Sequence, residues 1–503
     1  MRHAPACLAL ILCALVFGAS SAAAAPADLD RSFGGGDGIA EVAGSGGSLP
    51  GEAGGRMAIG PNDEIFVLYS NYAPCDPPFG CAVGLTVARY TADGLPDPAF
   101  APGPQLAVTQ SPLEDEFDLA VGPDGKPVIA AYGGEEGLAV ARLGLDGRLD
   151  PSFGGDGVVS ASTKLIGSVR GVPKVAVQPD GKVLVAVEGG FEGENRSILV
   201  ARFTADGQLD PGFGDGGEAR PLLSTQTKPA GVFVGAGGTI TIPAPRCCLG
   251  GTPLYGAGFS VARLGPGGQP DPTWAGDGSL FFPTPGAEGA VEAATPTPDG
   301  GLLLSYEAST PTVSVPGTVI KLTPSGALDT SFGNAGALRL FNRVGAISSS
   351  DLALDARGRL VGVGWNSRIA VFRLRADGSK DRTFNGGERI VVPYGGGGTT
   401  EYMVGIQSSG RIVALGDSGL GAVKRFGLIA LRGGTDRSRC FGKKATIVGT
   451  RGRDRLAGTP RRDVIAALAG ADEVRGLSGP DLICGGKGRD RLFGGAGRDK
   501  VRR

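Results

Sequence analysis

Apolar residues occur in short runs separated by turn residues along most of the chain. The run Val175-Ala176-Val177 is followed by a Pro-Asp-Gly turn and then by the apolar residues 183–187. A third run, 198–203, ends in the second turn Thr204-Ala205-Asp206-Gly207. Near-continuous apolar runs of this length predict β-strands that are covered on both faces. Together with the run Gly157-Val158-Val159-Ser160, these three runs predict a structural unit of four β-strands.

The unit is repeated. The phrase Leu149-Asp150-Pro151-Ser152-Phe153-Gly154 has clear copies beginning at Leu29, Leu209 and Leu328, and degenerate copies beginning at Asp97, Asp271 and Asp381. The aromatic residue of the phrase stands at positions 33, 100, 153, 213, 274, 332 and 384. A period of about sixty residues is typical of propellers and solenoids. Seven four-stranded units predict a seven-bladed β-propeller, with an open β-solenoid as the alternative.

These phrases resemble the delta-60 repeat family over residues 28–432. The resemblance implies a repeat fold rather than a particular chemistry. We interpret the repeated Asp as a residue that binds amides of its own turn, and the repeated aromatic residue as core. The Gly-Asp-Gly phrases at 36–38, 155–157 and 276–278 are interpreted as turns, because they lack the alternating oxygen ligands of a calcium loop.

A second array follows a short linker, residues 433–439. From residue 440 onward an Asp recurs every nine residues, an apolar residue stands two positions after it, and Gly is frequent two and five positions before it. The aspartates are Asp454, Asp463, Asp472, Asp481, Asp490 and Asp499.

This array, residues 440–503, resembles the hemolysin-type (RTX) calcium-binding nonapeptide. The resemblance implies a short parallel β-roll in which two repeats complete a turn. It places Asp454, Asp472 and Asp490 on one edge and the other three aspartates on the opposite edge. Ca²⁺ would bind between consecutive loops of an edge, through carboxylates and backbone carbonyls. All six aspartates are therefore candidate metal ligands, with Asp472 and Asp490 expected to matter most and Asp463 least.

Two features oppose this interpretation. Arg461 and Ala467 stand where the repeat has Gly, and residues 440–503 hold 15 Lys and Arg against 7 Asp and Glu. A positive field weakens the binding of a cation at low salt. The alternative is a degenerate roll whose aspartates only cap turns. The basic surface could instead bind an anionic cell-wall polymer.

The N-terminus predicts export. Residues 1–25 combine a positive start, a short apolar core and small residues before a cleavage point near Ala25, as in a signal peptide. Six cysteines follow it. In an exported chain they predict disulfides, for which we expect Cys75–Cys81, Cys440–Cys484 and a vicinal or intermolecular bond of Cys247 and Cys248. The one histidine, His3, lies in the signal peptide, which excludes histidine-based catalysis in the mature chain.

The sequence therefore predicts a secreted, all-β, calcium-binding repeat protein that acts as a scaffold or adhesin. Its extracellular ligand is unknown, with a polysaccharide or cell-wall polymer as the candidate. The net charge of −1 predicts no general affinity for nucleic acid, and no later segment is long and apolar enough to span a membrane. The alternative is a carbohydrate-active enzyme with paired carboxylates in the propeller channel, for which Glu114-Asp115-Glu116 and Glu135-Glu136 are candidates. Only 8 Tyr and 2 Trp are available to stack on sugars, which favours binding without catalysis.

Overall fold

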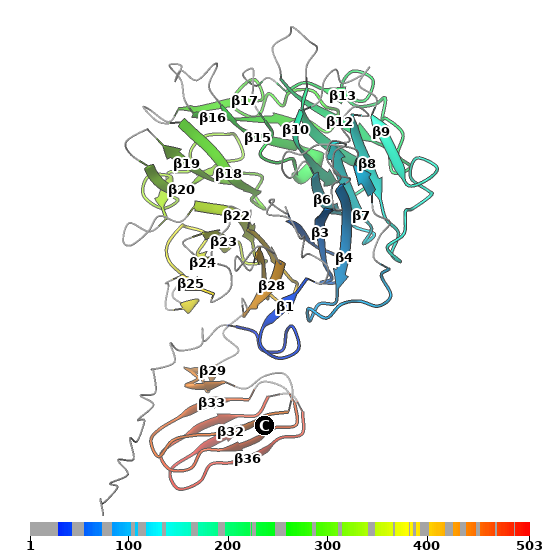
Figure 1. Cartoon of the computed structure of the whole chain (residues 1–503). Helices are drawn as coiled ribbons and strands as arrows, with labels where there is room; N and C mark the ends of the chain where they lie inside the picture. The colour runs from blue at the N-terminus through cyan, green and yellow to red at the C-terminus, as the bar shows by residue number, and fades with distance from the viewer. Residues whose placement is uncertain are drawn as a thin grey trace, which may run out of the picture.

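The repeated apolar runs form seven antiparallel four-stranded sheets, the blades of a β-propeller, in the computed structural model (Figure 1). The structure describes residues 29–42, 55–72, 83–101, 106–108, 117–132, 137–161, 170–189, 197–221, 223, 228–246, 258–283, 288–309, 314–340, 348–365, 368–381, 383–385, 389–392, 402–417, 426–432, 439–448, 453–467, 470–486 and 488–502. Within these ranges the structure has only short 3-10 turns such as η2 (Ala236–Gly238) besides its strands and loops, so the all-β prediction is confirmed.

The blades follow one another along the chain. Blade 1 consists of β2 (Gly55–Ile59), β3 (Ile65–Tyr72), β4 (Val83–Tyr90) and β5 (Leu106–Val108). Blade 2 consists of β6 (Phe117–Val121), β7 (Pro127–Tyr132), β8 (Leu138–Arg142) and β9 (Val158–Ala161). Blade 3 consists of β10 (Arg170–Val177), β11 (Val183–Gly189), β12 (Ser197–Phe203) and β13 (Glu218–Ala219). Blade 4 consists of β14 (Phe233–Val234), β15 (Ile240–Arg246), β16 (Gly258–Leu264) and β17 (Ser279–Pro283).

The last blade closes the ring. Blade 5 consists of β18 (Glu288–Pro296), β19 (Leu302–Ser309), β20 (Ser314–Leu322) and β21 (Ala337–Arg339), and blade 6 of β22 (Ser348–Leu354), β23 (Leu360–Trp365), β24 (Ile369–Leu374) and β25 (Ile390–Val391). Blade 7 consists of β26 (Met403–Ile406), β27 (Ile412–Asp417), β28 (Phe426–Leu431) and β1 (Ile39–Glu41). Because β1 pairs with β28, the start of the repeat region completes its last sheet. This pairing excludes the open solenoid.

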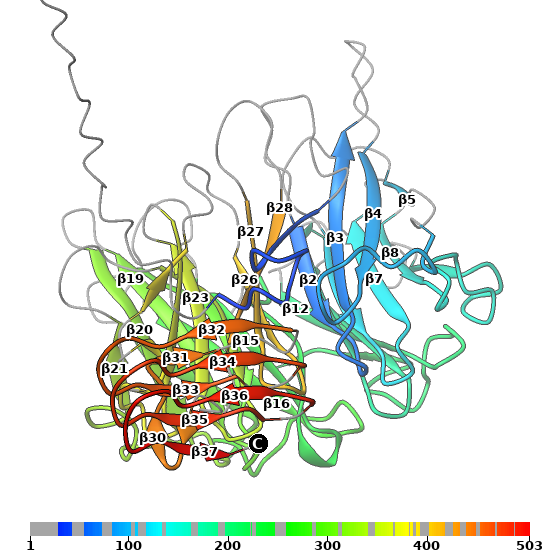
Figure 2. The same ribbon diagram turned by 90° about the horizontal axis from the view of Figure 1, so that it is seen from below.

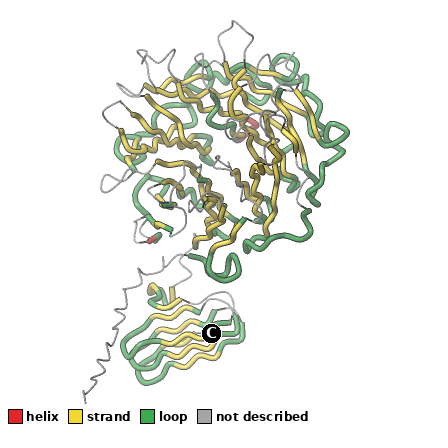
Figure 3. The backbone as a smooth tube through the Cα atoms, in the orientation of Figure 1, coloured by secondary structure: helices red, strands yellow, loops and turns green. Residues whose placement is uncertain are grey.

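The apolar runs are continuous because each middle strand packs against two neighbouring blades. On β11, Val183, Val185 and Val187 pack against blade 2. Leu184 and Ala186 of the same strand pack against blade 4. Similar clusters fill all seven interfaces between blades. The predicted coverage of both faces is thus confirmed, and the tube in Figure 3 shows how little of the ring is helix.

The repeated aromatic residue fills the space between its own blade and the next. Phe153 is fully buried in the cluster that joins blades 2 and 3. The backbone of Gly207, at φ +87°, passes so close that a Cβ there would lie 2.7 Å from the Gly154 nitrogen and 3.1 Å from the Phe153 ring. The second turn of blade 3, which contains Gly207, therefore needs Gly for close packing as well as for its dihedral angle.

An ion pair lies beside each of these aromatic residues, and the sequence patterns above do not predict it. In blade 3, the Arg202 Nε of β12 lies 2.8 Å from the Asp210 Oδ2, and its guanidinium lies 4.4 Å from the centre of the Phe213 ring. The same guanidinium donates to the Pro266 carbonyl of blade 4. Blade 1 repeats the arrangement, since Arg89 binds Asp97 and donates to the Leu145 carbonyl of blade 2 at 2.7 Å. We call this arrangement the inter-blade clamp.

The repeated Asp also holds its own turn, as predicted. The Oδ1 of Asp210 accepts the Gly212 amide at 3.0 Å, and that of Asp150 accepts the Ser152 amide at 3.1 Å. Burial raises the pKa of Asp210, but the Gly212 amide, Lys182 and Arg202 outweigh it, so the pKa lies below its ordinary value. In blade 5 the Ser331 hydroxyl and the Lys321 ammonium lower the pKa of Asp329 to about 2. These carboxylates are therefore ionised and structural at neutral pH.

The C-terminal nonapeptides form two facing parallel sheets, as the β-roll prediction requires (Figure 2). One sheet consists of β31 (Ile447–Val448), β33 (Val464–Ala466), β35 (Leu482–Cys484) and β37 (Lys500–Arg502), and the other of β32 (Arg455–Ala457), β34 (Glu473–Arg475) and β36 (Arg491–Phe493). Each strand pairs with the strand 18 residues further on, as Ile465 does with Ile483. Two repeats therefore complete one turn.

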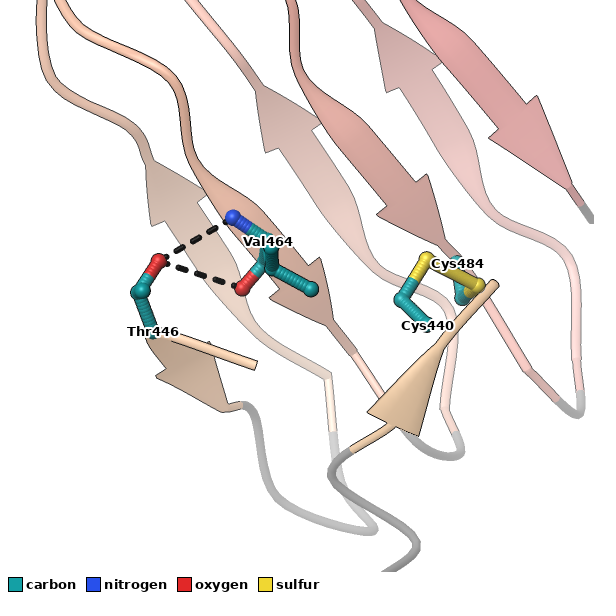
Figure 4. Close-up of a disulfide and its surroundings, with 4 residues drawn as sticks. All are labelled: Cys440, Thr446, Val464 and Cys484. Atoms are coloured by element: carbon teal, nitrogen blue, oxygen red, sulfur yellow. Dashed lines mark hydrogen bonds between the residues drawn. A yellow bond between two sulfur atoms is a disulfide. The ribbon is translucent and has the colours of Figure 1, made fainter. Parts of the chain in front are cut away.

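A small hairpin covers the outer face of one roll sheet. It consists of β29 (Arg439–Cys440) and β30 (Lys443–Lys444). Cys440 is buried with Leu482 and Cys484 and forms the predicted disulfide with Cys484 (Figure 4). Beside it, the Thr446 hydroxyl accepts the Val464 amide at 3.1 Å. The other predicted disulfides, of Cys75, Cys81, Cys247 and Cys248, lie outside the described residues.

Candidate functional site

The six aspartates of the nonapeptide array line the two edges of the roll in the predicted order. Along one edge, the Asp454 amide donates to the Asp472 Oδ1 at 2.9 Å, and the Asp472 amide donates to the Asp490 Oδ1 at 3.1 Å. Along the other, the Asp463 amide donates to the Asp481 Oδ1 at 2.8 Å and the Asp481 amide to the Asp499 Oδ1 at 2.9 Å. We call each row an aspartate ladder. One oxygen of each acceptor carboxylate is thereby fixed to the backbone.

The second carboxylate oxygen differs between positions. The Oδ2 atoms of Asp472, Asp481 and Asp490 are buried and have no hydrogen-bond partner among the described residues. Asp481 itself is fully buried, and Asp472 is 1% exposed. A buried carboxylate oxygen without a partner is costly, so such atoms are rare unless a cation or water binds them. In contrast, the Asp463 Oδ2 accepts the Thr459 amide at 2.6 Å and the Thr459 hydroxyl at 2.9 Å.

Glycines leave room beside two of these oxygens, those of Asp481 and Asp490. A Cβ at Gly476 would lie 2.5 Å from the Asp481 Oδ2 and 2.3 Å from the Gly494 carbonyl oxygen. A Cβ at Gly485 would lie 2.4 Å from the Asp490 Oδ2. A carboxylate and a carbonyl oxygen thus face the same small space, which any side chain at Gly476 would fill. Ala467 occupies the corresponding position in the repeat of Asp472.

Each carboxylate of a ladder makes the ionisation of its neighbours in the ladder less favourable. Burial raises the pKa of Asp481, and the carboxylates of Asp499 and Asp463 raise it further. The pKa of Asp472 is likewise raised by burial and by Asp490 and Asp454. A divalent cation between the loops would remove this repulsion. The donor set of carboxylate and carbonyl oxygens is that of a hard cation such as Ca²⁺.

Side chains alone do not complete a metal site. The described part of the chain contains no group of three or more His, Cys, Asp or Glu side chains placed to hold one ion. A cation in the roll would therefore take most of its ligands from backbone carbonyls, as the nonapeptide resemblance implies.

The roll surface is basic, as its composition indicates. Arg455, Arg475 and Arg491 lie exposed on the three strands of the β32–β34–β36 sheet. Glu473 is in register with Arg455 and Arg491 and lies 2.7 Å from Arg475, and these arginines lower its pKa. Adjacent strands are about 4.8 Å apart, so the three guanidinium groups form a positive patch that one carboxylate neutralises only in part. We call it the basic patch.

Two carboxylates on innermost strands of the propeller, those of Asp118 and Asp351, are bound by backbone amides of neighbouring blades. On β6, the Asp118 Oδ2 accepts the Val175 amide of blade 3 at 2.9 Å, and its Oδ1 lies 3.7 Å from the Arg56 Nε. On β22, the Asp351 Oδ2 accepts the Val404 amide of blade 7 at 2.9 Å. These two residues give no support to a catalytic carboxylate pair. The acidic clusters at 114–116 and 135–136 lie outside the described residues.

The Gly-Asp-Gly phrases are turns, as predicted. The Oδ1 atoms of Asp37, Asp156 and Asp277 accept the amides of Ile39, Val158 and Ser279, each two residues further on.

The architecture is that of a closed β-propeller repeat protein with a C-terminal β-roll, which is built from nine-residue repeats of the kind that bind calcium. Residues 122–153, 178–213 and 358–384 match the family described as "Domain of unknown function (DUF5122) beta-propeller". Residues 448–483 and 467–501 match the RTX calcium-binding nonapeptide repeat. The chain therefore contains DUF5122 propeller repeats followed by RTX repeats, which confirms both resemblances. No curated protein is significantly similar to it.

Several solved propellers resemble the chain distantly. The α-L-arabinanase of Penicillium chrysogenum is 11% identical, with a TM-score of 0.40 over 78% of this chain and 94% of that one. The α-L-arabinofuranosidase of Fusarium graminearum is 10% identical, with a TM-score of 0.40 over 77% and 94%. The propeller domain of the Pyrococcus furiosus Trilobed protease is 9% identical, with a TM-score of 0.41 over 74% and 93%. Similarity at this level says nothing about activity. No helix among the described residues is long and apolar enough to span a membrane.

Proposed function

We propose that the protein is a secreted scaffold or adhesin in which the propeller is a rigid platform and the roll is a calcium-binding module. The unpartnered, buried Oδ2 atoms of Asp472, Asp481 and Asp490 carry this proposal. All six ladder aspartates would serve as ligands, together with backbone carbonyls, and Ca²⁺ would neutralise the repulsion along each edge. Residues 1–25 would direct export, and 28–432, 433–439 and 440–503 would form the propeller, linker and roll.

The basic patch on the roll supports an anionic partner, such as an acidic polysaccharide or cell-wall polymer. Neutralising the buried aspartates with Ca²⁺ adds positive charge to the roll. Calcium binding would therefore favour the binding of a polyanion as well as stabilise the strands. Such binding should weaken as salt rises.

Calcium should order the roll in the full-length protein. We expect hydrogen exchange of residues 453–502 to slow when calcium is added and to recover in EDTA, because the ion links consecutive loops. Exchange of the blade strands should not change. Mg²⁺ at the same concentration is the control, since it requires near-octahedral geometry and loses its water reluctantly. Equal exchange in calcium and EDTA would support the degenerate roll in which the aspartates only cap turns.

A further inference from the structure

Blade 4 contains a pocket of about 380 Å³, with both polar and apolar groups in its lining, that the functions above do not use. It lies next to the inter-blade clamp, with Arg263 and Asp271 in its wall, and it extends to the first turn of blade 5. Its lining includes the threonines Thr239, Thr241, Thr273 and Thr297. Four of the other blades have a cationic side chain in this place.

In blades 2, 3 and 6 a second cation binds the clamp Asp from the residue that follows the first turn. The Lys126 Nζ lies 2.8 Å from the Asp150 Oδ2, and the Lys182 Nζ lies 3.1 Å from the Asp210 Oδ2. Arginines take the same position in blades 6 and 7. Arg359 contacts Asp381 at 3.2 Å beside the strand arginine of blade 6, and in blade 7, whose strand has Ala430 in place of that arginine, Arg411 contacts Asp30 at 2.8 Å. The clamp carboxylate is thus built to accept two cations.

Blade 4 lacks the second cation. Thr239 stands at the position of Lys126 and Lys182, one residue before β15. Among the described residues, Arg263 is therefore the one cationic side chain that contacts Asp271 in this arrangement, and its Nε lies 2.7 Å from the Asp271 Oδ2. The neighbouring blade adds to the space, because Gly301 holds the same position in blade 5 and contributes no side chain.

The pocket is also polar where other blades are apolar. Thr241 occupies the second position of its strand, where Val128, Leu184 and Val361 stand in blades 2, 3 and 6. A hydroxyl group in place of a methyl group adds a hydrogen-bond acceptor near the carboxylate. Burial raises the pKa of Asp271, but hydrogen bonds from Thr273 and the Arg263 charge lower it below its ordinary value. The carboxylate is therefore ionised at neutral pH.

We propose that this pocket binds a short alkylammonium group, which takes the place that the Lys126 and Lys182 side chains occupy in their own blades. The ammonium would donate to the Asp271 Oδ2, with the threonine hydroxyls as further acceptors, and its alkyl chain would lie where the lysine methylenes lie. A free amine and a lysine side chain of a partner peptide offer the same chemistry.

Propylammonium chloride is the probe for this site in the full-length protein, with n-propanol and sodium chloride as controls. We expect a saturable rise in the propeller's melting temperature with propylammonium alone. Thr239→Lys supplies the ammonium within the chain, so it should weaken propylammonium binding at least tenfold. Gln269→Lys adds the same charge at an exposed position of the same blade and should leave binding unchanged.

Equal stabilisation by sodium chloride, or equal binding by the Thr239→Lys variant, would overturn the proposal. If Thr239→Lys does not fold, Thr241→Val is the second test. It restores the residue type of the other blades and should weaken binding severalfold, and unchanged binding would again contradict the site. Tighter binding of 1,4-diaminobutane or of an Nα-acetyl-lysine amide than of propylammonium would support the site and identify the source of the amine.

Discussion

Asp481→Asn should make the roll more stable than the wild type in EDTA and less stable in calcium. The substitution keeps an oxygen that can accept the Asp463 amide, so the aspartate ladder can persist. It removes a fully buried charge that faces the carboxylates of Asp463 and Asp499. When calcium is present, the same carboxylate is a ligand of the ion. A ligand at about 100 times its Kd stabilises a protein by about 2.7 kcal/mol, and the variant should lose much of that gain.

Asp463→Asn is the matched control on the same edge. Its Oδ2 is already bound by the amide and hydroxyl of Thr459, so it has less to offer an ion. We expect a smaller loss of calcium-dependent protection than for Asp481→Asn. Hydrogen exchange of residues 453–502, with and without calcium, measures both variants. Equal effects of the two substitutions, or no reversal of sign for Asp481→Asn, would contradict the assignment of ligands.

Arg202→Ala should destabilise the propeller by about 2–3 kcal/mol, because it removes one of the two cations that bind the buried Asp210 carboxylate and leaves Lys182 alone to compensate that charge. The side chains of Arg202 and Asp210 are 7% and 10% exposed. The substitution also removes the contact with the Phe213 ring and the hydrogen bond to blade 4. The loss should be seen in thermal or urea unfolding, and hydrogen exchange should rise first at the interface of blades 3 and 4.

Two further variants compare the stability contribution of the inter-blade clamp with that of an ordinary surface charge. Arg148 and Asp146 form an exposed contact at 4.0 Å, with side chains 80% and 61% exposed. Arg148→Ala should therefore change stability by less than about 0.5 kcal/mol. Arg202→Lys should have an intermediate effect, because blade 5 uses Lys321 with Asp329 in the same place. A loss for Arg202→Ala as small as that for Arg148→Ala would show that the clamp contributes little.

Much of the fold can be predicted from the sequence because its signals are local and repeated. Apolar runs such as 183–187 indicate that both strand faces are covered, and the interface clusters confirm it. The period of the Asp and aromatic positions predicts the number of blades. The nine-residue spacing of the aspartates, through its resemblance to the RTX nonapeptide, predicts two repeats per turn, which the pairing of Ile465 with Ile483 confirms.

The inter-blade clamp was not predicted, although a signal exists. An Arg stands eight residues before the repeated Asp in blades 1, 2, 3, 4 and 6, as Arg202 does before Asp210. The partner carbonyl lies in the next blade, about sixty residues away, so no local pattern reveals it. The pairing of β1 with β28 could not be predicted for the same reason, since it joins the two ends of the repeat region.

Individual aspartates of the roll are harder to rank from the sequence. The sequence predicts that Asp463 matters least because Arg461 replaces Gly in its loop. The structure provides another reason, which is that Thr459 occupies its Oδ2. Asp481 is not singled out by the sequence, yet it is as deeply buried as Asp472 and its Oδ2 is also without a partner among the described residues. Burial and hydrogen-bond saturation depend on neighbouring turns, which sequence spacing alone does not show.

Isothermal titration of the full-length protein with calcium tests the central proposal most directly. The comparison is between the wild type and the variant Asp472→Asn/Asp481→Asn/Asp490→Asn, which retains ladder oxygens but removes the three unpartnered carboxylates. We predict saturable calcium binding by the wild type and its loss in the variant. No binding by the wild type, or the same binding isotherm for both proteins, would contradict the calcium-binding roll.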